Sequence, residues 1–132
     1  MDSIQESSVC SMTREDLVEL HKTMTEKALG ILRTKNHDYS GGSDGSCPFL
    51  NFSRVQNMGI TDTKTGFLVR MTDKLSRLVT FVKNGTFQTK DEALEDTVID
   101  LINYSILLYG YAQTEKDDYK EIKNGTTVPC SP

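Results

Sequence analysis

The chain has 132 residues, a formal net charge of −4 and a charged-residue content of 26%. This length accommodates one domain with its own core, but not two. The negative balance argues against general affinity for duplex DNA or RNA, which requires a basic surface, although a local basic patch is still compatible with a small anionic ligand. Because the chain has neither a signal peptide nor an apolar run long enough to span a bilayer, we expect a cytoplasmic protein that does not contact membranes.

Both ends of the chain lack the periodicity of a folded segment. Residues 1–12 are rich in Ser and Glu, and residues 114–132 pass from charged to small polar residues. We expect both ends to be disordered and the folded domain to occupy residues 13–113. The three cysteines are odd in number and far apart, so their spacing predicts neither a disulfide framework nor a zinc site.

The first periodic segment predicts an amphipathic helix over about residues 14–36. Thr13 and Asp16 have the spacing of a capping box. Seven apolar or weakly polar residues then fall on one arc: Leu17, Leu20, His21, Met24, Ala28, Ile31 and Leu32. We interpret His21 on this arc as a core or interface residue, in preference to a ligand. The glycine-rich segment 40–48 breaks the periodicity and predicts a loop long enough to act as a lid.

A short helix is expected over residues 49–57, with Phe49, Phe52 and Val55 toward the core. A second long helix begins at Thr63 or Thr65 and ends at Asn84-Gly85 with a left-handed cap. Its apolar stripe comprises Phe67, Met71, Leu75, Leu78, Val79 and Val82. Its other face carries Arg70, Asp73, Lys74 and Arg77 within about 100°.

A third long helix is expected from near Thr89 to about Gln113, and it contains polar residues within an apolar run. Asp96, Asp100 and Asn103 fall within about 60° on a helical projection, with Glu95 at their flank. Two readings remain open. The oxygens form a Mg²⁺-type arrangement, or the acids pair with Arg or Lys on a facing helix.

No segment predicts a strand, so we expect an all-α antiparallel bundle of three long helices and one short helix. The apolar faces exceed what three helices can bury, which indicates completion by oligomerisation as a homodimer or homotetramer. We expect the third helix, with Tyr104, Tyr109 and Tyr111, to contribute to that interface.

Four blocks, in order along the chain, carry a family resemblance. They are KNHDY (35–39), PFLNF (48–52), GFLVRMTDKLSR (66–77) and EDTVIDLINY (95–104). The chain thereby resembles a phage and bacterial family labelled the nucleotide modification associated domain. That family looks like a branch of the all-α nucleotide pyrophosphohydrolases, which include MazG-like enzymes and dimeric dUTPases. If the chain is phage-encoded, the cytoplasm would be that of a bacterial host.

The resemblance implies a helical oligomer that binds a nucleoside phosphate through Mg²⁺. It assigns metal binding to Asp73, Glu95, Asp96 and Asp100, and catalysis to Asp73, Asp96 and Asp100. Candidate ligand-binding residues are Lys35, Asp38, Tyr39, Asn51, Arg70, Lys74, Arg77, Asn103 and Tyr104. The chain departs from the family pattern at Thr97, where an acid is expected, and at Asp73, which lacks a second acid.

Two functions follow as hypotheses. One is Mg²⁺-dependent hydrolysis of a nucleoside triphosphate, or of a modified nucleotide, to a monophosphate and pyrophosphate. The other is non-catalytic binding, for example by a phage protein that sequesters a nucleotide signal of host immunity. The resemblance favours the enzyme, whereas the thin set of acids favours binding alone.

Overall fold

The computed structural model describes the backbone of residues 11–39, 47–85 and 91–124, and the side chains of 11–36, 47–85 and 94–116. The described backbone contains four helices and no strand: α2 (Arg14–Tyr39), α3 (Leu50–Asn57), α4 (Thr63–Asn84) and α5 (Asp91–Asn124). Within these residues the expected all-α class is confirmed. None of the described helices is long and apolar enough to cross a membrane.

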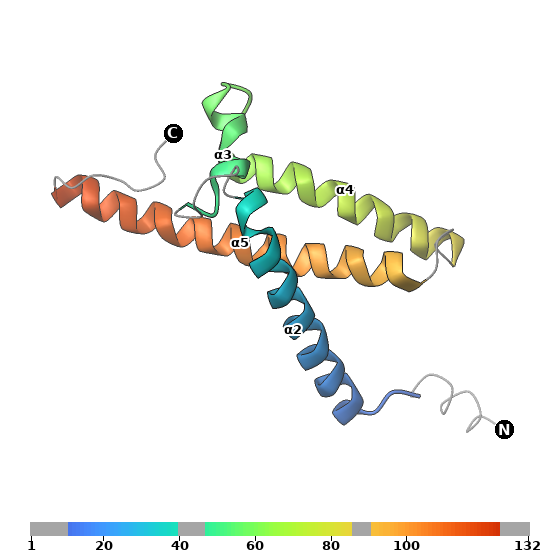
Figure 1. Ribbon diagram of the computed structural model, residues 1–132. Helices are drawn as coiled ribbons and strands as arrows, with labels where there is room; N and C mark the ends of the chain where they lie inside the picture. Colours follow the sequence, from blue (N-terminus) through green and yellow to red (C-terminus); the bar gives the residue numbers. More distant parts are fainter. Residues whose placement is uncertain (1–10, 40–46, 86–90, 125–132) are drawn as a thin grey trace.

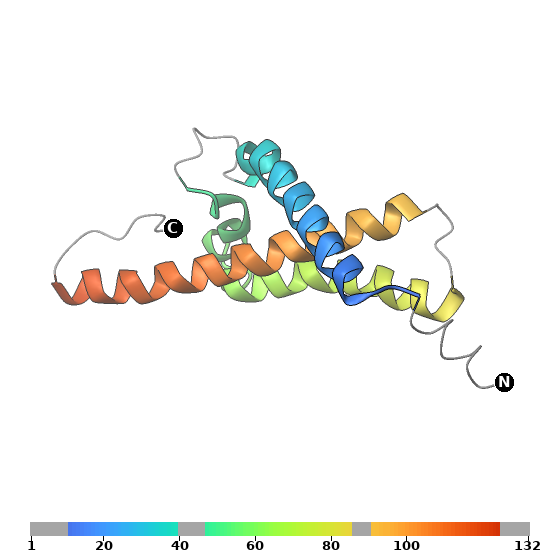
Figure 2. The ribbon, with the colours of Figure 1, turned by 90° about the horizontal axis from the view of Figure 1, so that it is seen from below.

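Helices α4 and α5 lie side by side and run antiparallel (Figures 1 and 2). The short helix α3 lies at the start of α4. Helix α2 does not extend the antiparallel array, because it crosses α5 obliquely and its first half projects beyond the α4–α5 pair in Figure 1. The α4–α5 layer therefore forms the frame on which the other two helices rest.

Local capping defines where two of the helices begin and where one ends. The expected capping box is present: Thr13 N–H donates to Asp16 Oδ2 and Asp16 N–H donates to Thr13 Oγ1, both at 3.0 Å. Helix α4 is capped by Asp62, whose Oδ1 accepts from Thr65 N–H at 2.7 Å. These backbone hydrogen bonds lower the pKa of Asp16 and of Asp62. Gly85, with a φ of 75°, ends α4 in the expected left-handed cap.

Two helices are longer than the sequence predicted. Helix α2 continues to Tyr39, three residues past the expected end, so the KNHDY block is helical. Helix α5 continues to Asn124, so the expected end near Gln113 is wrong and part of the segment expected to be disordered is helical. Residues 1–10, 40–46, 86–90 and 125–132 lie outside the described residues, and they include most of the expected loop and the expected start of the third helix near Thr89.

The core is an aromatic cluster where α3, α4 and α5 meet. Phe49, Phe52, Phe67 and Leu107 are buried, and the Phe52 and Phe67 rings stack with centroids 4.3 Å apart. Gly66 permits this close approach, since a Cβ at that position would lie 2.8 Å from Val55 Cγ2. Cys47 packs against the cluster and is disulfide-bonded, which the cysteine spacing did not predict.

The expected apolar stripe of α4 divides between two faces. Phe67, Met71 and Leu78 face the core, whereas Leu75, Val79 and Val82 are exposed. His21 is exposed, so it is not a core residue of this chain. Tyr104 and Tyr111 pack against the aromatic cluster, so only Tyr109 of the three tyrosines assigned to an oligomer interface is exposed. The sequence therefore identified apolar faces but not the neighbour of each.

Candidate functional site

An ion pair joins the centre of α4 to the first half of α5. Lys74 Nζ lies 2.9 Å from Asp100 Oδ2, and the two side chains are only 14% and 19% exposed. The basic face of α4 and the carboxylate of α5 therefore meet, as the sequence predicted. Of the two readings left open, the structure shows direct pairing between Asp100 and a cation on the facing helix. That pairing neutralises a carboxylate that would otherwise be costly to bury.

Arg70 lies one turn before Lys74 and is held differently. Its guanidinium carbon lies 4.8 Å from the centroid of the Phe52 ring, a cation–π contact that fixes an exposed cation over the aromatic cluster. Arg70 forms no ion pair with any described residue. Tyr104, one turn after Asp100, meets Phe52 edge-on with centroids 6.0 Å apart. Asn51, adjacent to Phe52 in α3, is half-buried.

The carboxylates assigned to a metal do not converge in the described chain. Asp73 lies 3.6 Å from Arg77 NH2 on the exposed side of α4, and its side chain is 64% exposed. Glu95 Oε1 lies 2.6 Å from Lys27 Nζ of α2, and Asp96 is exposed. No three His, Cys, Asp or Glu residues among those described are grouped closely enough to hold a metal ion. Within the described residues, the carboxylates therefore do not surround one point, as the oxygen ligands of Mg²⁺ do.

Asn103 uses its amide to hold α2 against α5. It is 2% exposed, and its Nδ2 donates to the carbonyl oxygen of Ala28 at 3.0 Å. Ala28 is buried at this crossing, and its small side chain allows the two helix backbones to come close. The amide assigned to ligand binding thus has a structural partner that the sequence pattern did not indicate.

Replacing Asn103 with leucine is expected to lower the free energy of unfolding by about 1–2 kcal/mol, because a buried carbonyl loses one of its hydrogen bonds. Chemical denaturation followed by circular dichroism measures the change. Ser105→Ala is the control, since Ser105 is exposed and its hydroxyl donates to the Leu101 carbonyl oxygen of the same helix. An Asn103→Leu variant as stable as the control would contradict a structural role for the amide.

The remaining ligand-binding candidates lie near the end of α2. Lys35 is exposed on the last turns of this helix. Asp38 and Tyr39 belong to its final turn, but their side chains are outside the described residues. The structure therefore joins Lys74 to Asp100 and brings Arg70 and Tyr104 to the same Phe52 ring. Asp73 and Glu95 pair elsewhere, with Arg77 and with Lys27.

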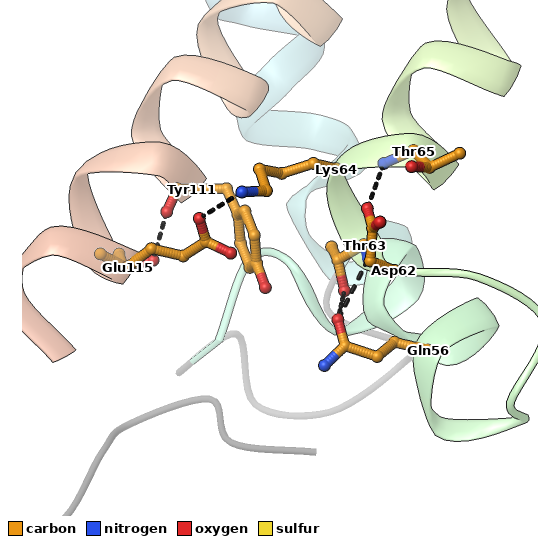
Figure 3. A network of polar contacts seen from close by, with 8 residues as sticks. Gln56, Asp62, Thr63, Lys64, Thr65, Tyr111 and Glu115 are labelled. Carbon is orange, nitrogen blue, oxygen red and sulfur yellow. Dashed lines mark hydrogen bonds and ion pairs between the residues drawn. The ribbon is translucent and has the colours of Figure 1, made fainter. Parts of the chain in front are cut away.

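A polar network that the sequence did not predict ties the end of α5 to the start of α4 (Figure 3). Lys64 Nζ lies 3.0 Å from Glu115 Oε2, and the hydrogen bond with Glu115 raises the pKa of Lys64. Beside it, buried Thr63 donates through its N–H and its hydroxyl to Gln56 Oε1, at 3.1 and 2.9 Å. One feature of the sequence could have indicated this network. Tyr111 and Glu115 are four residues apart, so they lie on one face of the helix if it continues past Gln113.

Comparison of the chain with protein-family models, with curated proteins and with solved structures found no match.

Proposed function

We propose that the chain binds a nucleoside phosphate on the polar face formed by Arg70, Lys74, Arg77 and Asp100. The observation that supports this proposal is Arg70, an exposed cation without a carboxylate partner among the described residues and fixed in position by the Phe52 ring. Arginine presents several N–H donors in a planar fork that suits phosphate oxygens. Holding the guanidinium in place before binding reduces the entropy lost when a phosphate arrives.

The neighbouring charges suit an anion of more than one phosphate. Arg77 lies two turns after Arg70 on the same face, and its contact with Asp73 is long and exposed, so water and salt screen it. Lys74 lies between the two arginines but is already neutralised by Asp100. The two guanidinium groups are therefore the cations most available to a polyphosphate.

Binding without hydrolysis is the form of this function that the geometry supports best. Asp100 is engaged by Lys74 in a poorly exposed pair, and Glu95 is paired with Lys27, so neither carboxylate is without a cation within one chain. A protein of this kind would retain its nucleotide intact, as expected for one that sequesters a nucleotide signal.

The second candidate is Mg²⁺-dependent pyrophosphohydrolysis of a nucleoside triphosphate or modified nucleotide. Asp96 supports it, because this exposed carboxylate lies one turn before Asp100 and forms no ion pair within the described residues. Further carboxylates would have to come from a second copy in a homodimer or homotetramer.

Incubation with a nucleotide panel, with Mg²⁺ or with EDTA, distinguishes the candidates by chromatography. Intact nucleotide retained in EDTA supports binding, and Mg²⁺-dependent release of pyrophosphate supports the enzyme.

Arg70→Gln is expected to weaken retention of a nucleoside triphosphate at least about tenfold, because a charge-assisted contact to phosphate is lost. Equilibrium dialysis at low ionic strength measures the change. Lys83→Gln is the control, since it removes one positive charge from the same helix at an exposed position near its end. If both variants lost nucleotide affinity equally, the loss would be an effect of net charge, and the support for a site at Arg70 would be removed.

A further inference from the structure

Two side chains of α4 pack against the Phe52 ring of α3. Phe67 covers one face of this ring, since the two rings lie 13° from parallel with centroids 4.3 Å apart. The guanidinium carbon of Arg70 lies over the same Phe52 ring, 4.8 Å from its centroid. Because one face of a phenyl ring is too small to hold both groups in contact, Arg70 occupies the face opposite Phe67. Phe67, Phe52 and Arg70 therefore form a column of planar groups.

The two ends of this column have different surroundings. Phe67 and Phe52 are 0% and 1% exposed, whereas Arg70 is exposed. Among the described residues, Phe52 is the only aromatic or charged group that contacts the Arg70 guanidinium. The column thus begins in the core and ends at the surface, where the side of the guanidinium away from Phe52 faces solvent.

A supported guanidinium face suits the flat surface of a nucleobase. The guanidinium group is planar, delocalised and weakly hydrated, so it stacks on π systems with a small desolvation cost. Proteins stack unpaired bases on arginine planes as well as on aromatic rings. Phe52 already holds Arg70 in place, which reduces the conformational entropy lost when a base stacks. The N–H donors lie around the edge of the guanidinium and remain available to phosphate oxygens.

The second available cation lies where the phosphates of such a nucleotide would extend. Arg77 is seven residues after Arg70, which is about 10.5 Å further along the helix and about 20° around it. A base over Arg70 is separated from the outer phosphates of the same nucleotide by the sugar and the phosphate chain. Arg77 is therefore suited to the phosphate end of a ligand whose base lies at Arg70.

We propose that the outer face of Arg70 is the stacking platform for the base of the bound nucleotide, with the phosphates extending along α4 toward Arg77. This inference rests on the proposed nucleotide binding and assigns a part of the ligand to each arginine. Every base has a flat π face, so the platform accepts purines and pyrimidines. It favours nucleotides over sugar phosphates and inorganic polyphosphates, which have no base to stack.

The test compares ligands that differ only in the base. Equilibrium dialysis of the full chain with labelled ATP measures displacement by AMP and by ribose 5-phosphate, which share the sugar and the phosphate. AMP is expected to bind about tenfold more tightly than ribose 5-phosphate, a typical contribution of stacking one base. Inorganic tripolyphosphate is also expected to displace ATP, because it presents the phosphates alone.

Two matched substitutions locate the effect. Arg70→Lys keeps the positive charge but removes the planar group, so it is expected to reduce the preference for AMP over ribose 5-phosphate to about twofold or less. Arg77→Lys makes the same replacement on the same face of α4, at a position where no described aromatic ring supports the guanidinium. It is expected to lower the affinity for both ligands by the same factor, which preserves the preference. Circular dichroism shows whether both variants remain helical.

The outcomes distinguish this inference from the proposed function. If AMP and ribose 5-phosphate bound the parent chain equally, or if Arg70→Lys kept the full preference for AMP, stacking on Arg70 would be overturned while phosphate binding remained supported. If neither ATP nor tripolyphosphate bound the parent chain, the proposed function would fail and the stacking platform would fail with it.

Discussion

Phe67→Ala is expected to lower the free energy of unfolding by about 3–5 kcal/mol, the largest effect of any single substitution considered for this chain. Phe67 is fully buried, stacks on Phe52 and lies 6.1 Å from the Tyr111 ring, between centroids. Its removal would leave a cavity among three helices, because the packed Gly66 backbone prevents α3 from moving in to fill it. Denaturant unfolding followed by circular dichroism measures the loss.

Val69→Ala provides the matched comparison on the same helix. Val69 is 60% exposed and, two residues after Phe67, lies on the side of α4 away from the core. Its truncation is expected to change stability by no more than about 0.5 kcal/mol. Similar losses for the two variants would contradict the assignment of the inner face of α4 to Phe67.

The helices and several of their ends could be predicted because local chemistry determines them. Thr13 with Asp16, and Gly85 after Asn84, are capping signals that act within one turn, and the structure contains both. The short helix with Phe49 and Phe52 toward the core was predicted for a similar reason, since two aromatic residues three apart face one side of a helix.

The continuation of α5 past Gln113 could not be predicted because the contact made there is with a residue distant in the sequence. Residues after Gln113 are strongly charged and show no apolar periodicity, so the sequence predicted a disordered segment. In the structure Glu115 instead pairs with Lys64 at the start of α4. Similarly, the oblique crossing of α2 depends on the small Ala28 and on a backbone carbonyl, which no side-chain pattern reveals.

The sequence predicted which residues belong to the candidate site, but not which side chains contact one another. The pattern placed Lys74 and Asp100 on facing helices, and the structure joins them. The same residue types serve a metal-bound phosphate and a plain ion pair, so only distances separate the two. Asp73 and Glu95 are acids like Asp100, but they pair with Arg77 and Lys27 at other places on the structure.

Asp100→Asn is expected to lower the free energy of unfolding by about 2–3 kcal/mol while leaving the helical content unchanged. Asparagine keeps the shape of the side chain but removes its charge, which leaves the poorly exposed Lys74 ammonium without its counter-ion. Combining Lys74→Met with Asp100→Leu is expected to recover most of this loss, because the double substitution removes both charges from the helix interface together. Denaturant unfolding of the parent chain, Lys74→Met, Asp100→Leu and the double variant forms a complete cycle that isolates the pair.

Asp100→Asn also distinguishes nucleotide binding alone from Mg²⁺-dependent hydrolysis. If Asp100 acts only as the partner of Lys74, folded Asp100→Asn retains nucleotide in EDTA at least as well as the parent chain, since Lys74 becomes free to contact phosphate. If Asp100 holds Mg²⁺, the variant loses its metal-dependent binding or turnover even at temperatures where it is fully folded. Loss of unfolding free energy with retained nucleotide binding therefore identifies a structural ion pair. Unchanged stability with lost Mg²⁺-dependent binding would instead restore the metal assignment that the sequence suggested.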